Sequence, residues 1–89
     1  MQTMACTLIA IERQRQIEEE NRTPEWDVKF NRPNQLSTAG AAYALQDATI
    51  WPFSAETYKP SPGNRIWELV KAAALIASEI DRILREYEQ

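Results

Sequence analysis

The C-terminal segment of the chain constrains the fold most, because apolar residues recur there at helical spacing for six turns. The apolar positions are Ile66, Leu69, Val70, Ala73, Ile76, Ala77, Ile80, Ile83, Leu84 and Tyr87. Charged and polar residues fill the opposite side of the segment, from Arg65 to Glu86. This period predicts an amphipathic helix over residues 65–87, and a helix of that length organises the fold of an 89-residue chain.

Two further segments have helical patterns. Residues 3–20 carry an apolar stripe through Met4, Leu8 and Ile11, with no helix breaker among the polar residues that follow. Residues 35–48 are rich in alanine, and we expect Asn34 to cap this helix at its N-terminus. Gly40 lowers helix propensity, so a close approach of another helix is the expected reason for it. We therefore expect the alanine-rich helix to pack tightly at the centre of the fold.

Two irregular segments separate these helices, at residues 21–34 and 49–63. The first holds two prolines and no periodicity, and it is predicted to be a loop with buried aromatic anchors at Trp26 and Phe30. The second holds three prolines and a glycine, which disfavour a helix. The sequence thus predicts one all-α domain over residues 1–89: three helices with two ordered loops rich in aromatic residues and proline.

Charge and composition exclude several classes of function. The net charge is −3, which argues against sequence-independent DNA binding. The absence of histidine and the presence of one cysteine, Cys6, argue against zinc sites and a Cys–His or Ser–His nucleophile pair. Cys6 is expected to be a core residue of the first helix. No segment resembles a signal peptide or a transmembrane helix, so we expect a soluble protein without a membrane partner.

The carboxylates could suit a magnesium-dependent nucleotide pyrophosphohydrolase, with Glu12, Glu19, Glu79 and Asp81 as the candidate ligands. Such enzymes repeat pairs of acids at three- or four-residue spacing on facing helices, and that repeat is absent here. A solvated charged face fits these residues better. We therefore expect no catalytic residues, no metal and no cofactor, and the hydrolase stays as the alternative.

The most distinctive stretch is the second loop with the start of the last helix, where aromatic and basic residues alternate. The candidate binding residues are Trp51, Phe53, Tyr58, Lys59, Arg65 and Trp67. A planar anion such as a nucleotide could stack on these rings, while the basic groups and the amides of a helix N-terminus meet its phosphates. The alternative is that the rings only cap a small helical core.

Several short motifs resemble a family of small uncharacterised proteins of tailed bacteriophages and prophages. The motifs, in order along the chain, are residues 11–16, residues 23–25, residues 41–44, Trp51-Pro52-Phe53, Tyr58-Lys59-Pro60 and residues 69–82. The resemblance covers nearly the whole chain and implies a viral origin more than an activity. Family members carry a cluster of the type His-Asp-Asp-x-x-His after the Thr-Pro-Glu segment. This chain keeps only Asp27 there, so any metal or catalytic role of that cluster is not expected here.

Together these features predict a non-enzymatic phage accessory protein that acts by binding in the cytoplasm of the infected bacterium. Inhibition of a host defence component is the expected outcome, with either a host protein or a small signalling nucleotide as the target. A minor structural or assembly protein of the phage particle is a further alternative. We also expect a homo-oligomer, because a short chain with a long apolar helix leaves apolar surface uncovered. The alanine-rich helix and the Ile/Leu stripe of the last helix are the expected seam.

Overall fold

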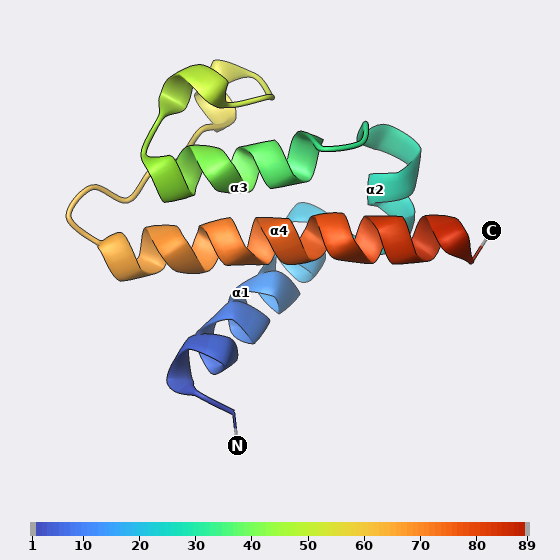
Figure 1. Ribbon diagram of the computed structural model, residues 1–89, viewed down its shortest axis with the longest axis horizontal. Helices are drawn as coiled ribbons and strands as arrows, with labels where there is room; N and C mark the ends of the chain where they lie inside the picture. The colour runs from blue at the N-terminus through green and yellow to red at the C-terminus, as the bar shows by residue number, and fades with distance from the viewer. Residues whose placement is uncertain (1, 89) are drawn as a thin grey trace.

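A computed structural model describes residues 2–88, which form helices joined by short loops (Figure 1). The elements are α1 (Met4–Glu20), α2 (Pro24–Phe30), α3 (Gln35–Leu45), the 3₁₀ helices η1 (Ala48–Ile50) and η2 (Ala55–Thr57), and α4 (Arg65–Tyr87). Residues 2–88 contain no strand, which confirms the all-α class. The three long helices α1, α3 and α4 lie where the sequence periodicity predicts them. None of the helices in this range is both long and apolar enough to cross a lipid bilayer.

Helix α4 spans the width of the molecule, and the other helices pack against it (Figure 1). Helix α3 runs alongside α4, α2 lies beside its C-terminal half, and α1 crosses behind it and projects away on the other side. The segment between α3 and α4, which contains η1 and η2, folds over the C-terminal end of α3. The long last helix is therefore the common support of the fold, as expected.

The apolar core lies between α3 and α4. Leu36, Ala39 and Tyr43 of α3 are buried against Ala72 and Leu75 of α4. The small side chains on both helices allow the two backbones to approach closely. This confirms the expected tight packing of the alanine-rich helix at the centre of the fold.

The buried residues of α1 are polar, which the sequence analysis did not anticipate: they are Glu12, Arg13 and Gln16. Arg13 Nε donates to Asp81 Oδ2 over 2.9 Å, and its guanidinium also donates to the carbonyl of Arg22 over 2.8 Å. Glu12 is fully buried and Glu79 is 5% exposed. The prediction of a solvated charged face is therefore wrong for these two glutamates. They are buried because arginine side chains neutralise them within the fold.

The predicted loop at residues 21–34 contains a short helix, α2. Thr23 Oγ1 accepts a hydrogen bond from the backbone N–H of Trp26, and Pro24 occupies the first turn, so the local sequence begins a helix well. Trp26 and Phe30 are 40% and 54% exposed, so they are not the buried anchors that we expected. The buried residue of α2 is Asp27, which accepts a hydrogen bond from the amide of Asn31.

The ends of α3 also differ from the prediction. The helix ends at Leu45, three residues early, because Gln46 takes a left-handed conformation with φ of 56° and its backbone N–H bonds back to the helix. Asn34 precedes the first turn as expected, but its φ is 71° and its side chain makes no capping hydrogen bond. The second predicted loop contains the two 3₁₀ turns η1 and η2.

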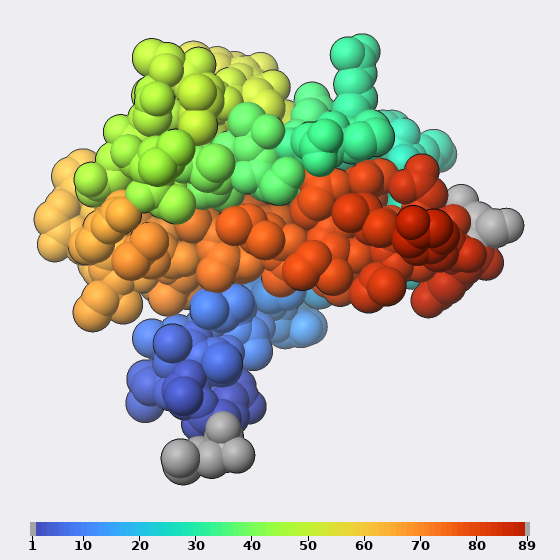
Figure 2. Space-filling view, in the orientation of Figure 1, coloured from blue at the N-terminus to red at the C-terminus, as the bar shows by residue number. Residues whose placement is uncertain are grey.

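Cys6 is exposed, so its assignment to the core is wrong. The reason is the course of α1. Its N-terminal half projects from the body of the molecule (Figure 2), and it contributes few buried side chains there. The backbone N–H of Cys6 takes part in the cap of α1, donating to Thr3 Oγ1.

Candidate functional site

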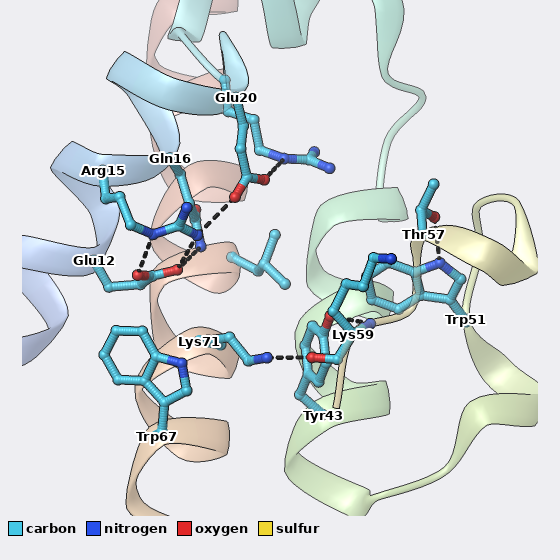
Figure 3. A pocket seen from close by; sticks show the side chains of 12 residues that line it. Glu12, Arg15, Gln16, Glu20, Tyr43, Trp51, Thr57, Lys59, Trp67 and Lys71 are labelled. Atoms are coloured by element: carbon cyan, nitrogen blue, oxygen red, sulfur yellow. Dashed lines mark hydrogen bonds and ion pairs between the residues drawn. The ribbon is translucent and has the colours of Figure 1, made fainter. Parts of the chain in front are cut away.

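A cavity of about 460 Å³ lies between α1, the first half of α4 and the segment that joins α3 to α4 (Figure 3). One wall comes from α1, with Glu12, Arg15, Gln16 and Glu20. The floor is α4, with Trp67, Lys71 and Leu75. The opposite wall holds Tyr43, Trp51, Thr57 and Lys59, and Arg22 completes the lining. The cavity thus joins aromatic rings to charged groups of both signs.

The carboxylates on the α1 wall are held by Arg15. Its guanidinium donates two hydrogen bonds of 2.8 Å to the two oxygens of Glu12 and a third, of 2.6 Å, to Glu20 Oε2. Gln16 Nε2 also donates to Glu12 Oε2, over 3.2 Å. The hydrogen bond to Glu12 is the main reason that the pKa of Arg15 is raised, against the opposing effect of burial. These acids are therefore neutralised within the protein.

Two lysines of the cavity have no such partner. Within residues 2–88, neither Lys59 nor Lys71 forms an ion pair. Lys71 Nζ donates to the backbone oxygen of Lys59 and lies 4.5 Å from the centroid of the Tyr43 ring (Figure 3). Burial lowers the pKa of Lys71, although Glu12 and Glu68 act in the other direction. Counted with Arg15 and Arg22, the cations of the cavity outnumber its two carboxylates, in a protein whose net charge is −3.

Most of the rings near the cavity pack against one another. Tyr43 stacks on Tyr58 with centroids 5.2 Å apart and meets Trp51 edge-on at 5.1 Å. Phe53 also meets Trp51 edge-on, with centroids 5.6 Å apart. The hydroxyl of Tyr43 accepts the backbone N–H of Lys59 over 2.9 Å, which fixes the loop on α3. This cluster packs against the apolar core. The same packing is expected if these rings only cap the core.

Trp67 differs from the other rings of the site. It lines the cavity from α4, is half-buried, and has no aromatic neighbour at stacking distance in the described chain. In Figure 3 it lies next to Glu12, across the cavity from Tyr43 and Lys59. The Trp67 ring therefore forms part of the cavity surface without belonging to the ring cluster.

The six candidate residues occupy three different positions in the structure. Trp51, Lys59 and Trp67 line the cavity, whereas Phe53 and Tyr58 lie in the ring cluster beside it. Arg65 lies outside the lining. Its guanidinium donates to the carbonyls of Ala44, over 2.6 Å, and Tyr43, over 3.4 Å, so it satisfies the C-terminal end of α3.

The sequence analysis missed the contribution of α1. Glu12, Gln16 and Glu20 recur every four residues on one side of that helix, and Arg15 lies between them. That spacing puts Glu12, Gln16 and Glu20 on one face of the helix and could have indicated a polar wall. Nothing in the local sequence identifies Lys71, because its place in the site depends on how α3 approaches α4.

The four carboxylates of the hydrolase alternative do not form one cluster within residues 2–88. Glu79 pairs with Arg82 over 2.9 Å, Asp81 pairs with Arg13 over 2.9 Å, and Glu19 has a side chain that is 65% exposed. Burial alone would raise the pKa of Glu79, but hydrogen bonds from Arg82 and from the backbone N–H of Ser37 outweigh it, and the pKa is lowered. Among residues 2–88, no three acid, cysteine or histidine side chains are placed to hold a metal ion.

No protein-family model, curated protein or solved structure matches this chain. The geometry of the cavity therefore carries the functional argument.

Proposed function

We propose that this protein binds a small aromatic anion, of the size and chemistry of a nucleotide, in the cavity between α1, α3 and α4. The observation that supports the proposal most directly is that one cavity brings together two lysines without an ion-pair partner among the described residues and a tryptophan ring. Lys59 and Lys71 have no ion-pair partner in the described chain, and Trp67 offers a ring with no aromatic neighbour.

The dimensions and chemistry of the cavity fit such a ligand. Its volume of about 460 Å³ lies within the usual range of small-molecule sites. A base stacked on Trp67 would gain about 1–3 kcal/mol, a typical value for stacking of a base on an aromatic side chain. Phosphates directed toward Lys59 and Lys71 would meet cations that form no ion pair within residues 2–88.

The biological role that we propose is a phage accessory function in the cytoplasm of the infected bacterium. A protein that binds a signalling nucleotide without consuming it lowers the free concentration of the signal by mass action. A host defence component that depends on the signal would then stay inactive. The resemblance to small phage proteins supports this setting, and the cavity favours a nucleotide over a host protein as the target.

The test is isothermal titration of the full chain with ATP, cyclic di-AMP, adenosine and inorganic pyrophosphate. We expect at least one nucleotide to bind more tightly than both adenosine and pyrophosphate, because base and phosphate contact different groups. Ligand released by heating should be chemically intact. If all four probes bind more weakly than about 1 mM, the proposal is wrong. Release of a hydrolysed product would favour the pyrophosphohydrolase instead.

Matched variants locate the site. Trp67→Ala and Lys59→Ala should each weaken nucleotide binding by about tenfold, in line with the loss of one stacking or charge contact. Trp26→Ala and Lys29→Ala remove the same residue types from exposed positions on α2 and should bind as the wild type does. Equal losses in both pairs would show that the effect is not specific to the cavity.

A further inference from the structure

The outer face of α4 is apolar and uncovered. The exposed side chains on it are Ile66, Leu69, Ile76, Ile80, Ile83, Leu84 and Tyr87, at 38–84% exposure. The face that α4 turns toward the rest of the protein carries both apolar and polar buried residues: Val70, Ala72, Ala74 and Leu75, with Glu68, Ser78, Glu79 and Arg82. Figure 2 shows α4 uncovered across the whole width of the molecule. A row of large apolar side chains on the longest helix is thus left to solvent in the single chain.

The spacing of the exposed residues follows a coiled-coil seam. From Ile66 the apolar positions alternate by three and four residues through 69, 73, 76, 80 and 83 to Tyr87. A strict alternation of this kind keeps one narrow stripe in line over three heptads, which is what a second helix packed along α4 requires. A helix that packs only against the core of its own chain needs no such regular stripe on its exposed side. Helix α4 contacts the core of the protein through its opposite side.

We propose that a second copy of this chain covers this face, with the two α4 helices antiparallel about a two-fold axis. One stripe can pair with itself in such a contact, because both copies present the same surface. A helix of 23 residues is about 34 Å long, so the stripe is long enough for a coiled-coil contact. This proposal does not depend on the ligand of the cavity.

The helix dipoles favour the antiparallel arrangement. Antiparallel helices place the positive N-terminal end of one beside the negative C-terminal end of the other, whereas parallel helices place like ends together. The charged side chains at the ends of α4 are paired within the chain, Arg65 with Glu68, Arg82 with Glu86 and Arg85 with Glu88, so they do not select a direction.

A second feature of the surface fits the antiparallel pair. An apolar hollow of about 350 Å³ lies at the N-terminal end of the stripe, lined by Met4, Leu8, Ile9, Ile66, Leu69 and Val70. Tyr87, at the other end of the stripe, is 84% exposed. The two-fold arrangement brings the ring of Tyr87 from each copy to the hollow of the other. At each end of the interface, the Tyr87 ring of one copy then packs in the apolar hollow of the other copy.

The first test is the mass of the full chain in solution, by sedimentation and light scattering from 1 to 100 µM. We expect twice the 10.3 kDa of one chain. Ile80→Glu should give a monomer whose circular dichroism stays helical, because Ile80 is 53% exposed and outside the core. Leu45→Glu changes a residue that is 70% exposed on α3 and should leave the dimer intact. A wild type that is monomeric at 100 µM would overturn the proposal and leave the face to a different partner.

The second test is the direction of the helices. In a Cys6→Ser background, Leu69→Cys and Ile83→Cys proteins are mixed and oxidised. The antiparallel pair brings position 69 of one copy near position 83 of the other, so we expect mixed disulfide dimers. Efficient coupling of Ile83→Cys with itself would indicate parallel helices and contradict the arrangement. Tyr87→Ala should raise the dimer dissociation constant at least tenfold, and an unchanged constant would contradict the role of the hollow.

Discussion

Gly40 of α3 lies directly against the backbone of α4 at Ala72. A Cβ atom at position 40 would be 2.8 Å from the Ala72 carbonyl oxygen and 2.9 Å from Ile76 Cγ1. Both distances are shorter than van der Waals contact, and the backbone oxygen cannot move without shifting α4. The absence of a side chain at this position therefore sets the distance between the two central helices.

The first prediction concerns this contact. Gly40→Ala should destabilise the protein by about 1–3 kcal/mol, the usual cost of overpacking a core, even though alanine favours a helix by about 1 kcal/mol. Urea denaturation followed by circular dichroism measures the change. Ala41→Gly, next to it on a less buried side, isolates the helix-propensity effect and should cost about 1 kcal/mol. A stabilised Gly40→Ala protein would show that α3 and α4 are further apart.

The fold was largely predictable from the sequence. Helical periodicity identified α1, α3 and α4, because each has a long run without a breaker. The short helix α2 was missed, although Thr23 and Pro24 form a good helix start. A segment of seven residues has too few turns for periodicity to show, so only the capping signal could have found it.

The candidate site was predictable only in part. Trp51, Lys59 and Trp67 come from the segment that the sequence singled out, and they line the cavity. The contributions of Arg15 and Lys71 depend on tertiary contacts between α1, α3 and α4. In a sequence, a charged residue that will be buried in an ion pair cannot be told from a surface charge. The residue pattern of one helix does not show which residue of another segment will neutralise that charge.

The second prediction concerns the buried ion pair of Glu79 and Arg82. Glu79→Gln should lower the unfolding free energy at pH 7 by about 3 kcal/mol, because it leaves the charge of a buried arginine without its main partner. Glu86→Gln removes the second, 56% exposed carboxylate of the same arginine and should cost no more than about 1 kcal/mol. Equal costs would mean that the burial of the pair has little effect.

The same pair predicts an acid dependence. The pKa of Glu79 is lowered in the folded state, so its stabilising contribution is present above its usual value of 4.5 and is lost as the pH falls through the lowered value. The unfolding free energy of the wild type should therefore decrease more steeply between about pH 5 and pH 3 than that of Glu79→Gln. Parallel curves for the two proteins would contradict the assignment.

The third prediction concerns Cys6. The residue is exposed near the start of α1, so a thiol reagent should reach it without unfolding. Its reaction with Ellman's reagent in native buffer should proceed at a rate within about tenfold of the rate in guanidinium chloride. A thiol that reacts only after denaturation would place the N-terminal half of α1 in a different, covered position.

The last prediction separates stability from binding at Lys71. Burial lowers the pKa of this lysine, so its charged form is disfavoured by the folded protein. Lys71→Met keeps the length of the side chain and removes the charge. We expect an unfolding free energy at pH 7 that is no lower than that of the wild type, together with nucleotide binding about tenfold weaker.

The sign of the pH effect follows from the same shift. A lysine whose pKa is lowered on folding binds fewer protons in the folded state, so the wild type should gain stability as the pH rises through the lowered value toward the usual 10.5. Lys71→Met should lack this gain, which urea denaturation of both proteins at pH 7 and at pH 10 can measure. If Lys71→Met loses more than about 1 kcal/mol at pH 7, the size of one typical hydrogen bond, its contacts with the Lys59 carbonyl and the Tyr43 ring are structural. Burial therefore disfavours the charged form of Lys71 in the folded protein, whereas the proposed binding of an anion depends on that charge.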